Sequence, residues 1–167
     1  MKLKLIPGKE VVFNEDLHQY TVDGREAISV TTLLTQVGIS EDFSKMPDAV
    51  KQKVEGARIR GNAYDALAED AINAPYDLNE WQKRFLEELE ANIPSTEHET
   101  QIRLGMHVVD EDDNILLTIA GSPDILGYLE GEFNSTTDVK ATYKINEISV
   151  TWQTNLYNIM KALLIDV

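Results

Sequence analysis

The chain has 167 residues, 43% of them hydrophobic, and a formal net charge of −14 at pH 7. These values are typical of one soluble domain over residues 1–167, and we expect an N-terminal hairpin extension over about residues 1–30. The absence of cysteine excludes disulfides and thiolate metal sites. No apolar run approaches the roughly 20 residues of a membrane span. Pro7 interrupts the start too early for a secretory signal. We therefore expect a cytoplasmic protein with no membrane partner.

The acidic charge argues against a nucleic-acid partner, because phosphate contacts require lysine and arginine. The bases are unevenly spread, however: four of them lie between residues 51 and 60, and Lys140 and Lys144 lie close together further on. Net charge does not exclude a local surface of the opposite sign. DNA binding therefore remains open, with Arg60 of the first basic group as a candidate contact.

The first forty residues show hairpin and helix signals. Val11–Phe13 and Gln19–Val22 are rich in strand-forming residues, and Asp23-Gly24 is a favoured two-residue hairpin turn. Ser29 is a good helix N-cap, and Gly38 is a good helix end. We expect two strands, a tight turn and a short helix.

Two longer helices are predicted before residue 94. Pro47 is a favoured first helical position, and small or apolar residues then recur every three or four positions as far as Ala71. A further helix over about Leu78–Asn92 places Trp81, Phe85 and Leu89 on one face.

After Pro94 the apolar pattern changes to period two. This change predicts strands, followed by one more helix at about Ser149–Leu164. The buried face expected for that helix consists of Trp152, Leu156, Ile159 and Leu163. The order of elements predicts a mixed α/β fold with a central mixed sheet flanked by helices. The strands are expected over Ile102–Val108, Ile115–Ala120, Ser122–Leu129 and Ser135–Ala141.

Three short clusters in the second half contain residues suited to metal-dependent hydrolysis. They are Gly121-Ser-Pro-Asp124, Asp138-Val-Lys140 and Gln153-Thr-Asn-Leu-Tyr157. Asp124 and Asp138 fall on separate predicted strands, so strand pairing can bring the two carboxylates together. Oxygen ligands of this kind suit Mg²⁺ and Mn²⁺.

The spacing within the second cluster adds a cation to this site. Asp138 and Lys140 are two residues apart on a predicted strand, so their side chains share a face. The ammonium group would then lie beside the metal, where it could orient water and offset developing negative charge. The side chain of Val139 points the other way, but its carbonyl oxygen remains available as a metal ligand.

Each cluster also has a purely structural interpretation. Asp-x-Lys is usually a solvated strand edge, and Pro-Asp is usually a turn. Gln153 and Tyr157 share one helical face, but Tyr157 also fits the boundary of an amphipathic helix. None of the three histidines shows a metal-ligand spacing, so we expect structural roles for them.

Taken together, Gly-x-Pro-Asp, Asp-x-Lys and Gln-x-x-x-Tyr resemble the PD-(D/E)xK nuclease superfamily, in particular its RecB-like exonuclease branch, which includes many phage proteins. The segments Phe13–Gly24 and Ser29–Leu33 are also similar to the N-terminal region of phage members. The resemblance spans nearly the whole chain. It implies a restriction-endonuclease-like core and two-metal hydrolysis of DNA.

The resemblance also implies roles for individual residues. Asp124 and Asp138 would bind Mg²⁺ or Mn²⁺, and Lys140 would be the catalytic lysine. Gln153 and Tyr157 would lie near the DNA strand.

The chain departs from the family pattern in two ways. The family usually has a histidine ligand on the long helix, where this chain has Asp65; that residue is either a replacement metal ligand or a helix-surface acid. Members also continue past the Gln-x-x-x-Tyr helix into at least one more strand, whereas this sequence stops at Val167, so the usual C-terminal strand is expected to be missing. A glutamate is common on the strand before the Pro-Asp segment, and Glu99 is the better match, with Glu97 close by.

Two hypotheses of different classes follow. The first is an Mg²⁺- or Mn²⁺-dependent deoxyribonuclease, an exonuclease of phage DNA recombination or replication, located in the host cytoplasm if the protein is phage-encoded. Its partners would be DNA and either further copies of itself or a phage recombination protein. The alternative is a catalytically weak binding or inhibitor protein with a nuclease fold and an acidic, DNA-like surface.

Overall fold

The computed structural model describes residues 2–140 and 146–165, and the chain divides into two compact units. The first unit takes in Met1–Glu41, Arg103–Pro123 and Glu147–Val167, and the second takes in Asp42–Ile102 and Asp124–Asn146. Of the residues that the structure describes, none belongs to a helix long and apolar enough to cross a membrane.

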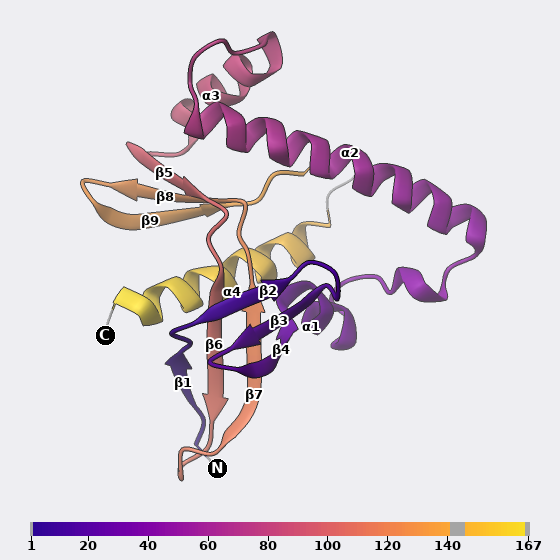
Figure 1. The fold of residues 1–167 in the computed structure, drawn as a ribbon, viewed down its shortest axis with the longest axis vertical. Coiled ribbons are helices and arrows are strands. Elements are labelled where there is room, and N and C mark those ends of the chain that lie inside the picture. Colours follow the sequence, from indigo (N-terminus) through magenta and orange to yellow (C-terminus); the bar gives the residue numbers. More distant parts are fainter. Residues whose placement is uncertain (1, 141–145, 166–167) are drawn as a thin grey trace. The chain divides into compact units, whose positions relative to one another are not determined.

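The first unit contains a six-stranded sheet in the order β1-β6-β7-β4-β3-β2 (Figure 1). β4 and β7 run parallel, and the other neighbouring pairs in this sheet are antiparallel. The sheet is therefore mixed, as predicted. Its strands are β1 (Lys4–Pro7), β2 (Val11–Asn14), β3 (Gln19–Val22), β4 (Arg25–Ser29), β6 (Leu104–Val109) and β7 (Ile115–Gly121).

Local signals in the N-terminal segment produce the expected turn and helix. Asp23 and Gly24 join β3 to β4 with φ angles of 51° and 74°, the left-handed values that a two-residue hairpin turn requires. Helix α1 (Val30–Gln36) begins after Ser29, whose hydroxyl accepts a hydrogen bond from the amide of Thr32. Gly38, at φ 78°, follows the end of the helix. These predictions are confirmed.

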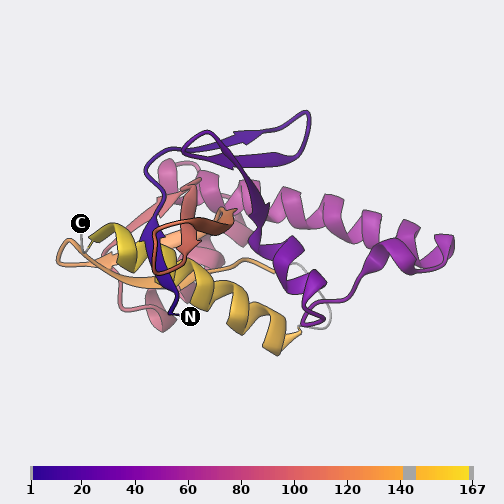
Figure 2. The same ribbon diagram turned by 90° about the horizontal axis from the view of Figure 1, so that it is seen from below.

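Helix α4 (Glu147–Ile165) packs against β1, β6 and α1 through a face that differs from the predicted one (Figure 2). Gln153, Tyr157 and Met160 are its buried residues. Trp152 is 51% exposed and Ile159 is 40% exposed, so the prediction that they are buried is wrong. The helix is apolar on most of its circumference, and the position of its partner therefore decides which side is covered.

The second unit combines a three-stranded antiparallel sheet with two α-helices. The strand order is β5-β8-β9. The helix α2 packs against α3 and β5 (Figure 1). The elements are η1 (Phe43–Lys45), α2 (Asp48–Asn73), α3 (Glu80–Asn92), β5 (Glu97–Thr100), β8 (Ile125–Leu129) and β9 (Glu132–Thr137).

An N-terminal capping box and a row of aromatic rings fix α3 on α2. Asn79 and Gln82 exchange side-chain and backbone hydrogen bonds at the start of α3. The ring of Trp81 stacks on Phe85 at 5.3 Å and lies 5.1 Å from the ring of Tyr64 on α2. The expected apolar face of this helix is confirmed.

The strands around the acidic clusters are shorter than predicted. β8 begins at Ile125 rather than Ser122, and β9 ends at Thr137. The predicted strand Ser135–Ala141 is therefore wrong after Thr137, and its last residue lies outside the described residues. Asp124 precedes β8, and Asp138 follows β9.

Candidate metal centre

Asp124 and Asp138 stand at the same end of the β8–β9 hairpin. Ile125 and Thr137 are register partners in the antiparallel pairing of the two strands. Asp124 comes immediately before the first of these residues, and Asp138 comes immediately after the second. Strand pairing thus brings Asp124 and the Asp-x-Lys segment together within the second unit, as the sequence predicted.

A backbone hydrogen bond orients Asp124 toward the Asp-Val-Lys segment. The amide N–H of Val139 donates to Oδ2 of Asp124 over 2.7 Å. This bond replaces a strand-to-strand bond beyond Thr137 and fixes one carboxylate oxygen of Asp124. No sequence pattern predicts this bond, because it depends on the path of the chain after β9 ends.

Asp138 forms an ion pair with Lys140. The Nζ atom of Lys140 contacts Oδ2 of Asp138, whose side chain is only 3% exposed. The side chain of Lys140 is 36% exposed, so this side of the pair is partly open to solvent. Burial of a carboxylate without a partner is costly, and the lysine supplies the compensating charge here.

Asp65 lies on α2 and interacts electrostatically with this pair. Burial raises the pKa of Asp65, the positive charge of Lys140 lowers it, and the negative charge of Asp138 raises it further; the net shift is upward. Its buried Oδ1 atom has no hydrogen-bond partner among residues 2–140 and 146–165. A buried carboxylate oxygen without a hydrogen bond is unusual and requires an explanation.

Asp124 has the most strongly shifted pKa of the group. Burial raises the pKa to about 7, and the negative charges of Asp138 and Asp65 act in the same direction. The hydrogen bond from Val139 and the charge of Lys140 oppose the shift without cancelling it. Three carboxylates and one ammonium group therefore share one electrostatic environment in the second unit.

The donor chemistry of this group suits a hard divalent cation. Every ligand offered is an oxygen, and Mg²⁺ is commonly bound by one or two carboxylates with several waters retained. Within the described part of the chain, no set of three or more histidine, cysteine or acidic side chains is arranged to hold a metal ion. The residues therefore fit a metal site with two carboxylate ligands, Asp124 and Asp138, and Asp65 is a nearby additional oxygen donor.

Glu97 and Glu99, the glutamates that the family resemblance suggested, lie on β5. Glu99 accepts a 2.5 Å hydrogen bond from the hydroxyl of Tyr128, and burial followed by that bond raises the pKa of Tyr128 well above its ordinary value. Glu97 is exposed and is the register partner of Tyr128. Arg60 is exposed on α2, five residues before Asp65.

Gln153 and Tyr157 belong to the first unit, whereas the carboxylates and Lys140 belong to the second. The Gln153 amide donates to the Tyr157 hydroxyl over 3.5 Å, and both side chains are buried. Tyr157 also packs on Gly121: a Cβ atom at Gly121 would lie 2.7 Å from its ring. The Gly-Ser-Pro-Asp segment thus begins with a residue that α4 requires to be glycine.

Comparisons of the chain with models of known families, with curated proteins and with solved structures find no match.

Proposed function

We propose that the chain is a divalent-metal-dependent deoxyribonuclease with a restriction-endonuclease-like core. The observation that supports this most directly is the group formed by Asp124, Asp138, Asp65 and Lys140. Mutual repulsion and burial make three neighbouring carboxylates unfavourable, as the raised pKa of Asp124 indicates. A bound cation would remove that penalty, and perturbed acids of this kind are typical of functional sites.

In this proposal each residue has a distinct task. Asp124 and Asp138 hold Mg²⁺ or Mn²⁺, which supplies Lewis-acid stabilisation of the phosphate and a more acidic water. The amide of Val139 holds Oδ2 of Asp124 through a hydrogen bond, and this bond orients the whole carboxylate, including Oδ1. Lys140, already beside Asp138, provides positive charge next to the attacked phosphate. Asp65 supplies a further oxygen donor.

The proposal also covers the substrate and the biological role. The order of motifs favours DNA as the substrate and exonucleolytic cleavage in phage recombination or replication, with Arg60, which is exposed on α2, as a contact to the strand. Gln153 and Tyr157 are buried in the first unit, so the expectation that they lie near the DNA strand is not carried into the proposal. The cytoplasm of the host would be the site of action. DNA would be the partner, together with further copies of the chain or a recombination protein.

The test measures cleavage and metal binding on the same samples. Metal-stripped protein is incubated with Mg²⁺ or Mn²⁺ and end-labelled linear DNA, single- and double-stranded, and with closed circular DNA. We expect cleavage of linear DNA that Asp138→Asn or Lys140→Ala lowers by at least about 100-fold. Asp112→Asn, an exposed acid in the turn between β6 and β7, is the matched control and should leave cleavage unchanged.

A second candidate function follows from one observation. The described residues hold no three-member ligand group, and Lys140 already neutralises Asp138. Both features suit a nuclease fold that binds a partner through its acidic surface without catalysis. In that case Mn²⁺ would not raise the melting temperature of the folded protein, whereas an intact site gains stability on binding metal. Absence of both cleavage and Mn²⁺ stabilisation would reject the nuclease in favour of this candidate.

A further inference from the structure

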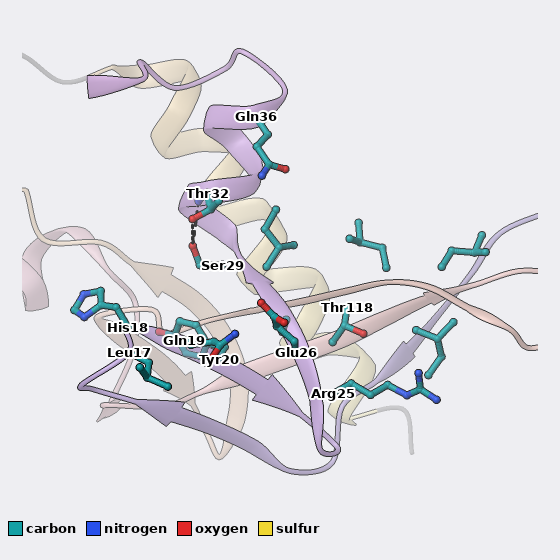
Figure 3. A pocket seen from close by; sticks show the side chains of 15 residues that line it. Leu17, His18, Gln19, Tyr20, Arg25, Glu26, Ser29, Thr32, Gln36 and Thr118 are labelled. Atoms are coloured by element: carbon teal, nitrogen blue, oxygen red, sulfur yellow. Dashed lines mark hydrogen bonds between the residues drawn. The ribbon is translucent and has the colours of Figure 1, made fainter. Parts of the chain in front are cut away.

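A hollow of about 980 Å³ opens in the first unit between β4 and β7 (Figure 3). This volume is near the upper end of the roughly 300–1,000 Å³ typical of ligand sites. Its lining includes three unbroken runs of residues, Leu17–Tyr20, Arg25–Ser29 and Ile115–Thr118. Neighbouring residues on a strand point to opposite faces. On β4 and β7 the lining therefore takes in residues that point to both faces of the sheet, not to one face alone.

The two strands separate where the hollow lies. β4 and β7 are parallel neighbours, yet their pairing is confined to Ile28 with Ile119 and Ser29 with Ala120. Residues 25–27 pair with β3 on their other edge, and residues 115–118 run beside β6. Among the residues that the structure describes, no strand pairs with the edges that face the hollow. Unpaired strand edges present the amide and carbonyl groups that another strand binds.

Side chains at the mouth of the hollow add charge and apolar surface. Arg25 and Glu26 both line it (Figure 3), and the side chain of neither forms an ion pair or hydrogen bond with another described residue. Being consecutive, the two charges project to opposite faces of β4. Leu116 and Leu117 on β7 are 50% and 37% exposed and also line the hollow.

We propose that this hollow binds an extended segment of another polypeptide, which adds a strand between β4 and β7. Four residues along residues 115–118 would span about 13 Å. Opposite charges stabilise each other across paired strands, so the segment should carry an acid opposite Arg25 and a base at the adjoining position opposite Glu26. Apolar side chains on either face of the segment would cover Leu116 and Leu117.

The chemistry of the lining favours a polypeptide over a nucleic acid. Arg25 is the one lysine or arginine among the described lining residues, and Glu26 lies next to it. Phosphate backbones require several cations. By contrast, two open strand edges match the alternating donors and acceptors of an extended peptide, the arrangement used when a peptide adds a strand to a sheet.

The experiment uses two blocked seven-residue peptides of alternating valine and threonine that differ only in the order of a central aspartate–lysine pair. Binding to the full chain is followed by hydrogen exchange of the backbone amides. We expect one peptide to bind at least about threefold more tightly and to protect residues 25–28 and 115–118. The double variant Arg25→Glu with Glu26→Arg keeps the net charge and should reverse the preference between the peptides. N-methylation of alternate peptide amides should abolish the protection.

Four outcomes would overturn the proposal. They are no protection at millimolar peptide, protection confined to other residues, an unchanged preference in the double variant, and equal binding of the N-methylated peptide. Two control arms test other occupants. Protection of the same amides by a ten-residue oligothymidylate instead of the peptides would assign the hollow to nucleic acid. Protection that grows with protein concentration alone would assign it to a second copy of the chain.

This inference does not depend on the nuclease proposal, because every residue of the hollow lies in the first unit and the carboxylates lie in the second.

Discussion

The amide of Val139 and the carboxylate of Asp124 are joined by a 2.7 Å hydrogen bond that closes the open end of the β8–β9 hairpin. The bond favours the ionised form of Asp124, because an amide donor stabilises negative charge on the oxygen. Burial and two neighbouring carboxylates favour the protonated form and dominate, so the pKa of Asp124 stands at about 7. The titration of this one residue should therefore be visible in both stability and metal binding.

Without metal, the stability of the protein should fall as pH rises from about 4 to about 7 through the contribution of Asp124. Folding raises the pKa of this acid, so its contribution is fully present below the unfolded pKa and is lost as pH passes the folded value of about 7. Asp124→Asn removes the titration and keeps an acceptor for Val139. We would measure the free energy of unfolding by urea titration in EDTA. Between pH 4 and 8, its value for the variant relative to the parent should rise by up to about a few kcal/mol. An identical pH dependence in both proteins would contradict the assignment.

Binding of Mn²⁺ should release protons and strengthen with pH. A metal ion binds the ionised carboxylate, and Asp124 is largely protonated below pH 7. Between pH 5 and 6 the dissociation constant should fall roughly tenfold from this one proton. Calorimetry in two buffers of different ionisation enthalpy measures the protons released. Asp112→Asn should behave as the parent, whereas pH-independent binding would exclude Asp124 as a ligand.

Gly121 should not tolerate a methyl group. Alanine at this position places Cβ 2.7 Å from Cε1 of Tyr157, whose side chain is buried, so the ring or the backbone must shift. Overpacking of this kind costs about 1–3 kcal/mol. Gly61→Ala is the matched control: a Cβ there meets no atom within 4 Å, so on α2 it should stabilise by about 0.5–1 kcal/mol. Chemical unfolding of both variants decides, and equal effects would show that Tyr157 does not restrict Gly121.

Asp23 should anchor the β3–β4 turn to the rest of its unit. Its carboxylate accepts hydrogen bonds from the amides of Lys9 and Glu10 and contacts Nε2 of His107 at 3.0 Å. Burial raises the pKa of Asp23, but these hydrogen bonds outweigh it and leave the pKa below its ordinary value. The contribution to stability is therefore present above the unfolded pKa and is lost as pH falls through the lower folded value.

Substitutions at Asp23 separate its turn geometry from its charge. Asp23→Ala should cost about 1–3 kcal/mol, because two amides lose their acceptor and alanine is disfavoured at φ 51°. Asp23→Asn suits the turn, keeps one acceptor oxygen and should cost less at neutral pH. As pH falls from 6 to 2, the free energy of unfolding should decrease less in the asparagine variant than in the parent. Urea unfolding across this pH range measures the difference. An alanine variant as stable as the parent would show that the contacts are dispensable.

The elements that could be predicted are those fixed by local chemistry. Asp23-Gly24, the Ser29 cap and the aromatic face of α3 depend on residues close in sequence, and all three are confirmed. The buried face of α4 could not be predicted, because apolar residues occupy most of its circumference. Gly121 determines it by leaving space that Tyr157 fills.

In the candidate site, too, some features could be predicted from the sequence and others could not. Pairing of neighbouring strands was enough to predict that Asp124 and Asp138 meet. The amide of Val139 as a donor to Asp124 follows from the path of the chain after β9 ends, which no periodicity encodes. The sequence left two interpretations of Asp65, a replacement metal ligand and a helix-surface acid. The residue is half-buried and its Oδ1 atom has no hydrogen-bond partner among the described residues, which argues against a fully solvated surface acid.

Replacing Asp65 with histidine should change which metal the protein prefers. Aspartate offers a hard oxygen, whereas imidazole suits softer transition metals better than Mg²⁺. Since burial and Asp138 raise the pKa of Asp65, the substitution also removes an unfavourable negative charge. We expect Asp65→His to bind Mn²⁺ at least as tightly as the parent and Mg²⁺ about tenfold more weakly or worse, by calorimetry at pH 8. Asp65→Asn, which keeps the size and one oxygen, should weaken both metals alike. If Asp65→His leaves the ratio of Mn²⁺ to Mg²⁺ affinity unchanged and Asp65→Asn weakens neither metal, Asp65 is a helix-surface acid outside the coordination shell.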